Sequence, residues 1–151
     1  SKLLKDGHVN GAIKYFDEAL SLETDTAKKP KYAYIVAALM YRKGNIAQCR
    51  QYCQKTLQYN PSNGGAYLLQ ANCIARAASG DALQRSYFYC LAYDYCNKAK
   101  AVDPSPAAKA NRAAANYAAH FYPKSEAFFA GIKAGQTVSV PGFGTTTLRL
   151  R

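Results

Sequence analysis

Apolar residues recur at intervals of three and four along most of this chain, the spacing that places them on one face of a helix. In residues 8–22 they fall at Val9, Ala12, Ile13, Phe16, Ala19 and Leu20. The same spacing predicts further helices over residues 31–42, 45–59, 66–78, 82–102, 106–121 and 125–132. The pattern therefore predicts an all-α protein in which amphipathic helices follow one another through short turns.

Gly, Asn and Pro separate the predicted helices. Lys43-Gly44-Asn45 lies between helices 31–42 and 45–59, and Asn60-Pro61 follows the second of them. Gly and Asn accept the backbone conformations that end a helix, and Pro lacks the N–H needed to continue one. Helix, turn, helix and stop occupy about 34 residues. We expect this unit to be the central complete repeat of the chain.

An incomplete unit is predicted before this central repeat. Gly7 aligns with Gly44, so residues 1–7 are expected to be the last turn of one helix and Gly7 the turn that leads into residues 8–22. A chain that opens in the middle of a repeat is expected to be a fragment of a longer protein.

A third unit is predicted after Asn63. Helices 66–78 and 82–102 form it, and Asp103-Pro104 ends it as Asn60-Pro61 ends the central unit. Its second helix is about nine residues longer at its start than a repeat requires, which indicates a loop or an extended helix. Residues 1–105 are therefore predicted to be repeats.

Residues 106–134 are predicted to be capping helices that cover the last apolar face of the array. Pro suits the first turn of a helix, as at Pro106, and Ser suits the N-cap, as at Ser125. In the second capping helix, Phe128 and Phe129 are expected to face inward.

In the tail, residues 135–151, apolar residues recur with a different period. Val138 and Val140 alternate with polar residues before Pro141-Gly142-Phe143-Gly144, and Leu148 and Leu150 do so after it. This alternation predicts a β-hairpin. Because a lone hairpin is only marginally stable in water, it must dock on the last helices or pair with another chain.

Composition adds a strong positive charge. The chain has 20 Lys and Arg against 9 Asp and Glu, a formal net charge of +11, and no acidic residue occurs between Thr26 and Gly80. Such a field favours an acidic partner, whether peptide, nucleic acid or anionic membrane. The alternative is that the acidic complement lies in a part of the protein outside this chain. No apolar run is long enough to predict a transmembrane segment.

Three motifs resemble the tetratricopeptide repeat (TPR) family. They are Gly7–Ala12–Phe16–Ala19–Leu20, Gly44–Ile46–Leu57–Asn60-Pro61 and Ala92–Ala99–Val102-Asp103-Pro104. The resemblance implies a TPR-like α-solenoid of helix-turn-helix repeats and a non-catalytic scaffold that binds a partner protein or peptide through its concave face. The last 55 or so residues also resemble the C-terminal ends of bacterial cell-envelope TPR proteins of unassigned activity. That implies the periplasm or cell envelope, with the cytoplasm as the alternative.

In the family, the first helix of each repeat lines the concave groove. Carried over by register, the groove positions are Lys31, Tyr34, Ile35, Ala38, Tyr41, Arg42, Leu68, Leu69, Asn72, Ala75 and Arg76. Asn can hydrogen-bond a peptide backbone, and Arg can bind a carboxylate with two bonds. The alternative for each Tyr is packing between repeats, and for each Arg a solvated surface.

The sequence offers less support for other functions. Thirteen tyrosines among basic residues could stack on bases, so nucleic acid is the alternative partner. Neither His8 nor His120 lies in a catalytic motif, so we expect no enzyme and no cofactor. The five cysteines include no CxxC pair. Cys49 and Cys53 are predicted to pack in the core, with a disulfide between neighbouring helices or a metal as the alternatives.

Overall fold

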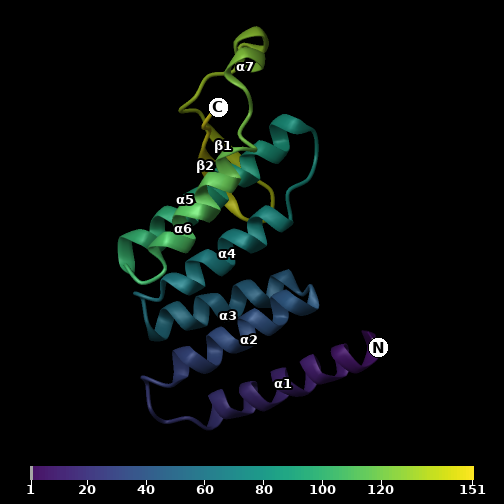
Figure 1. The fold of residues 1–151 in the computed structure, drawn as a ribbon, viewed down its shortest axis with the longest axis vertical. Helices are drawn as coiled ribbons and strands as arrows, with labels where there is room; N and C mark the ends of the chain where they lie inside the picture. Colours follow the sequence, from purple (N-terminus) through teal and green to yellow (C-terminus); the bar gives the residue numbers. More distant parts are fainter. Residues whose placement is uncertain (1) are drawn as a thin grey trace.

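The computed structural model describes the backbone of residues 2–151 and the side chains of residues 7–151 (Figure 1). In this part of the chain the helices are α1 (Lys2–Leu22), α2 (Lys29–Lys43), α3 (Ile46–Tyr59), α4 (Gly64–Arg76), α5 (Ala82–Val102), α6 (Ala107–Ala118) and α7 (Lys124–Ala130). The strands are β1 (Thr137–Val140) and β2 (Gly144–Thr147). The predicted all-α class with a small C-terminal hairpin is confirmed.

The helices form an elongated stack (Figure 1). From α1 to α6, each helix packs on the next one along the chain, and α2 also touches α4. Buried apolar side chains form the core in three clusters, one around α2 to α4, one around α4 to α6, and a smaller one between α5 and the C-terminal tail. No helix in residues 2–151 is long and apolar enough to cross a membrane.

The turn between α2 and α3 has the predicted structure. Gly44 ends α2 with φ +91°, a left-handed conformation that costs glycine little because it has no Cβ. The Asn45 side chain then accepts a hydrogen bond of 3.1 Å from the Gln48 N–H and caps α3.

The predicted turn at Gly7 is wrong. The helix α1 runs from Lys2 through Gly7 to Leu22 without a break, and Gly7 is not among the residues with positive φ. A single Gly inside a helix costs only about 1 kcal/mol relative to Ala. No capping residue follows Gly7 as Asn45 follows Gly44, so nothing starts a new helix there. Ser1 lies outside the described residues.

The additional residues of the third unit extend a helix rather than form a loop. The helix α5 has 21 residues, against 14 in α3. It begins at a capping box, in which the Asp81 side chain accepts from the Gln84 N–H and the Gln84 side chain accepts from the Asp81 N–H.

The prediction for α7 is wrong in two respects. The helix begins after Pro123, so Ser125 lies inside it and is not its N-cap. Phe128 and Phe129 point outward and are 80% and 88% exposed, while Ala127 is the buried residue of this helix. Because α7 has only seven residues, about two turns, burial of the Ala127 side chain alone anchors it to the rest of the molecule.

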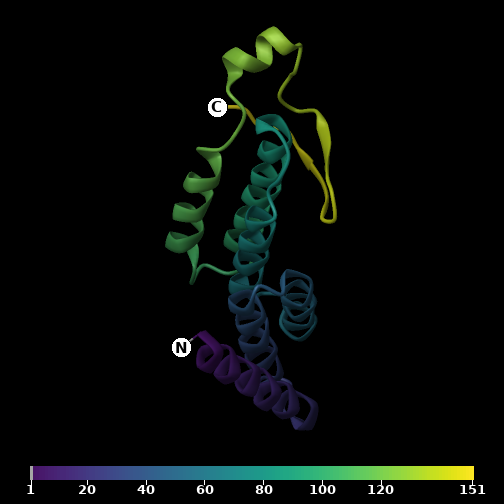
Figure 2. The same cartoon turned by 90° about the vertical axis from the view of Figure 1, so that its right-hand side faces the viewer.

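The hairpin docks on the molecule itself. It lies on one side of α5 while α6 lies on the other (Figure 2). Val140 and Leu148 are buried, and the Phe143 ring packs edge-on against Phe88 with centroids 6.1 Å apart. The alternation of apolar residues in the tail thus supplies one covered face, which a lone hairpin needs in order to be stable.

The cysteines belong to the core, as predicted for Cys49 and Cys53. All five are buried and free. The sulfurs of Cys49 on α3 and Cys73 on α4 lie 3.3 Å apart. Contact with Cys53 and burial raise the pKa of the Cys49 thiol to about 12, so at neutral pH it is a small apolar group.

Candidate functional site

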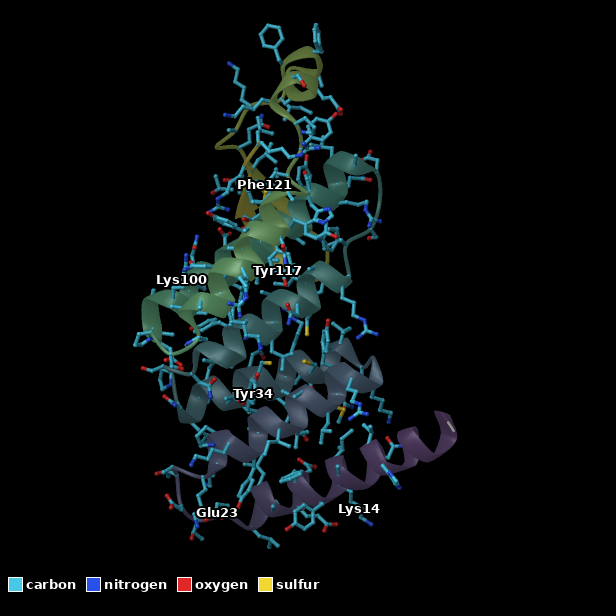
Figure 3. The ribbon with its side chains drawn as sticks, viewed as in Figure 1. Lys14, Glu23, Tyr34, Lys100, Tyr117 and Phe121 are labelled. Atoms are coloured by element: carbon cyan, nitrogen blue, oxygen red, sulfur yellow. The ribbon has the colours of Figure 1, made fainter. Side chains whose placement is uncertain are left out.

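A hollow with a volume of about 350 Å³ opens between α2, α4, α5 and α6. It brings together four of the sequence-predicted residues and four that lie further along the chain. The residues that line it are Tyr41, Asn72, Ala75, Arg76, Tyr89, Asn116, Tyr117 and His120. Figure 3 shows Tyr117 near the end of α6, and its hydrogen bond to Asn72 places it on the side that faces α4.

Arg76 is held in position at one side of this hollow. Its Nη1 donates a 3.0 Å hydrogen bond to the carbonyl of Tyr41, in the last turn of α2, where partial negative charge accumulates. The guanidinium carbon lies 5.1 Å from the centre of the Tyr41 ring, a cation–π contact. One of the five N–H donors is therefore engaged, and the side chain as a whole is exposed.

Asn72 and Tyr117 form a second fixed contact across the hollow. The Tyr117 hydroxyl donates a 2.5 Å hydrogen bond to Oδ1 of Asn72. Because this bond uses the carbonyl end of the amide, the Asn72 NH₂ donors are directed away from Tyr117. Burial raises the pKa of Tyr117, so its hydroxyl remains a donor across the neutral range.

A second hollow, of about 310 Å³, continues from the first. Tyr89 and His120 line both, and their rings are stacked with centroids 4.3 Å apart. The remaining residues that line it are Ala82, Arg85, Ala119, Phe121, Tyr122, Pro123 and Arg151. We refer to the two hollows together as the central groove.

The central groove is positively charged. Arg76, Arg85 and Arg151 line it, and none of the residues that line it in the described part of the chain is Asp or Glu. At its rim the pKa of Tyr122 is raised by burial and, to a smaller degree, by the carboxylates of Glu126 and Asp81. The groove can therefore offer hydrogen-bond donors and positive charge to an anionic ligand.

Arg42 does not reach the central groove. It lines a separate hollow of about 290 Å³ with Leu39 of α2 and with His8, Val9 and Ala12 of α1. Arg42 and Arg76, which the TPR register places in one groove, thus line different surfaces.

The other sequence-predicted positions divide between surface and core. Lys31 is exposed in the first turn of α2, and Tyr34, Ile35 and Ala38 are half-buried. Burial raises the pKa of Tyr34, whose ring packs beside Gly65. Leu68 and Leu69 are packed inside the stack and offer almost no surface to a partner, because they face α5 and α2–α3 respectively.

Four of the eight residues that line the first hollow were not predicted as site residues from the sequence. Tyr89 lies in α5, Asn116 and Tyr117 lie in the last turn of α6, and His120 follows α6. This part of the chain was predicted to extend the third repeat and to cap the array. The amphipathic pattern of α6 predicts that it packs, and nothing local indicates that its last turn faces Arg76.

The side chains that line the central groove include arginines, asparagines and aromatic rings. In the described residues no group of three or more His, Cys, Asp or Glu side chains is placed to hold a metal ion. His120 is stacked on Tyr89, and no carboxylate lines the groove to orient it as a base. The chain matches no known family model, and a search of curated proteins finds no match.

Proposed function

We propose that this chain is a non-catalytic, TPR-like scaffold that binds an acidic, extended peptide segment of a partner protein in the central groove. The helix-turn-helix stacking supports the repeat architecture, since each helix from α1 to α6 packs on its neighbour and α2 touches α4. The turns at Gly44-Asn45 and Asn60-Pro61 divide one unit into two helices, so that α2 begins at Lys29 and α4 at Gly64, a separation that supports a period of about 34 residues.

One observation carries the proposal. Arg76 and Asn72 lie on the same face of α4, one helical turn apart, and both side chains are oriented by fixed partners, Tyr41 and Tyr117. A donor held in place before binding loses less side-chain entropy when a ligand arrives. Arg76 fits a carboxylate and the Asn72 amide fits a peptide carbonyl.

The length of the groove supports an extended ligand. Its two hollows meet at Tyr89 and His120, whose flat rings offer stiff contact area between the arginines at either end. An acidic segment that spans both hollows would meet Arg76 first and Arg85 or Arg151 beyond the rings.

Nucleic acid is the less favoured partner, because many aromatic rings are already used by the chain. Six lie under its own Lys or Arg side chains, among them Tyr41 under Arg76 and Tyr52 under Lys55. A ring with one face covered in this way is a poorer stacking platform for a base.

The proposal is tested with a fluorescein-labelled peptide of alternating Glu and Ala that has a free C-terminal carboxylate. Fluorescence anisotropy should show that Arg76→Glu weakens binding by at least about tenfold, since a charged hydrogen bond is replaced by repulsion. Arg76→Met, which keeps the apolar stem, should weaken it less. Arg42→Glu is the matched control: it makes the same change of net charge in a different hollow, and it should keep the affinity within about twofold.

Equal weakening by Arg42→Glu and Arg76→Glu would show that net charge and not the groove determines binding. Undiminished binding by Arg76→Glu, with helical circular dichroism unchanged, would contradict the proposal. A labelled oligothymidine that binds more tightly than the peptide, with a steep dependence on salt, would favour nucleic acid instead.

A further inference from the structure

The two most exposed large apolar side chains of α7 are neighbours. Phe128 and Phe129 are 80% and 88% exposed, and their ring centroids lie 5.7 Å apart. The helix that carries them forms one end of the long axis of the molecule (Figure 1). We refer to Phe128 and Phe129, with the α7 backbone beneath them, as the aromatic tip.

The aromatic tip is held by the fold. The Lys124 N–H donates to the carbonyl of Arg151 at 2.8 Å, and the Ile132 N–H donates to the carbonyl of Ala127 at 2.9 Å. Ala127 is fully buried underneath. With about 100° between successive helical residues, an inward Ala127 turns Phe128 and Phe129 to the outer side of the helix. Their exposure is therefore imposed by the way in which α7 is seated.

Two lysines flank the aromatic tip, and one acidic residue, Glu126, lies in α7 between them. Lys124 begins α7 and Lys133 follows it, and both are exposed. Residues 104–151 contain six Lys and Arg residues and a single acidic residue, Glu126. Two aromatic rings between exposed lysines combine an apolar surface with attraction to an anionic one.

We propose that the aromatic tip inserts into the surface of an anionic lipid bilayer. The two rings would enter the boundary between headgroups and acyl chains, and Lys124 and Lys133 would bind lipid phosphates. A bilayer fits the shape because the tip projects from the end of the molecule, where it can meet a flat surface without the rest of the stack intervening. This site is separate from the central groove, so it does not depend on the proposed function.

Co-sedimentation with vesicles tests the proposal. The protein should sediment with phosphatidylcholine vesicles that contain about one quarter phosphatidylglycerol and weakly with phosphatidylcholine alone. Phe128→Ser with Phe129→Ser should reduce binding by at least about tenfold. Tyr15→Ser with Leu22→Ser, which removes two exposed apolar side chains from α1 at the other end of the stack, should leave it unchanged.

Charge reversal gives a second pair of variants. Lys124→Glu with Lys133→Glu should reduce binding by about fivefold or more for each lysine. Lys14→Glu with Lys43→Glu makes the same change in net charge on α1 and α2, and its effect should be several times smaller because both residues lie far from the tip.

A fluorescent reporter detects insertion directly. The chain has no Trp, so Phe129→Trp creates a single probe at the tip and Leu22→Trp a control at the opposite end. Anionic vesicles should shift the emission of the tip probe to shorter wavelength, and brominated lipids should quench it, while the control probe stays unchanged.

Binding that is lost on charge reversal but unaffected by the double Ser variant would overturn insertion. So would an unshifted emission of the tip probe on vesicles to which the protein binds. Absence of sedimentation, together with a dimer in gel filtration that the double Ser variant abolishes, would assign the tip to a second copy of this chain instead.

Discussion

At Gly64 the start of α4 packs closely against the end of α5 and the residues that follow it. A Cβ at this position would lie 2.9 Å from Asp103 Cβ and 2.9 Å from Pro106 Cγ, nearer than such atoms approach one another. The Gly64 N–H also donates a 3.1 Å hydrogen bond to Asp103. That bond and another from Ser105 lower the pKa of Asp103, with the Ser105 contribution being the larger. Glycine is therefore required at position 64 because a side chain would not fit there, and not because of an unusual φ.

We expect Gly64→Ala to lower the free energy of unfolding by about 1–3 kcal/mol, because an additional methyl group must displace Asp103 or Pro106. Gly11→Ala is the matched control. Gly11 also lies inside a helix, and its Cβ would have no neighbour within 4 Å. It should raise the free energy of unfolding by about 0.5–1 kcal/mol through helix propensity alone. Urea titrations followed by circular dichroism measure both, and equal effects would contradict the packing explanation.

At the scale of elements, the hairpin is attached to two different helices. Asp94 of α5 binds Nη2 of Arg149 at 2.7 Å and accepts a hydrogen bond from the hydroxyl of Thr146. From α3, the Nη1 of Arg50 donates to the carbonyl of Gly142 at 2.9 Å, in the hairpin loop. A hairpin too short to be stable alone therefore connects α3 to α5.

Removing Asp94 should loosen this attachment. We expect Asp94→Ala to lower the free energy of unfolding by about 1–3 kcal/mol, since Thr146 is buried and loses its partner. In a double-mutant cycle, Asp94→Ala and Arg149→Ala should show a coupling of about 0.5–1 kcal/mol, the range for a partly exposed ion pair. A parallel cycle of Asp94→Ala with the distant Lys14→Ala should be additive. A coupling near zero in the first cycle would show that the ion pair does not hold the hairpin.

At the scale of the whole molecule, the reactivity of the buried cysteines reports where the stack of helices opens. Cys49 and Cys53 lie in α3, Cys73 in α4, and Cys90 and Cys96 in α5. Burial raises the pKa of Cys96 to about 11, and contact with Cys53 and burial raise that of Cys49 to about 12. Cys49 and Cys96 therefore form few thiolates near neutral pH while the stack is closed, and alkylation of the buried thiols needs an opening.

We expect iodoacetamide at about pH 8 to react slowly with the native protein and rapidly with all five thiols in denaturant. Among the native sites, Cys49 and Cys53 should react sooner than Cys90 and Cys96. The reason is that α5 packs against α4, α6 and the hairpin, whereas α3 packs chiefly against α2 and α4. Peptide mass spectrometry after timed quenching measures the order. Equal rates at every site would show that the stack opens as one cooperative unit.

Much of the fold is set by local pattern. The helices, the Gly44-Asn45 turn and the tail hairpin were predictable because each depends on residues within a few positions of one another. The same is true of the buried Cys49 and Cys53, which lie on the apolar face of α3. The prediction at Gly7 was wrong because a Gly in a helical pattern ends the helix only when neighbouring residues can cap the start of another helix.

The sequence by itself determined that this chain folds as successive amphipathic helices with a β-hairpin at its end, and that its charge is strongly positive. Only the tertiary structure decided that Arg76 and Asn72 meet Tyr117 and His120, that Arg42 lies in a different hollow, and that Phe128 and Phe129 face outward. The physical reason is that periodicity reports which face of an element is apolar. Which other element covers that face, or leaves it open, depends on contacts between residues that lie far apart in the chain.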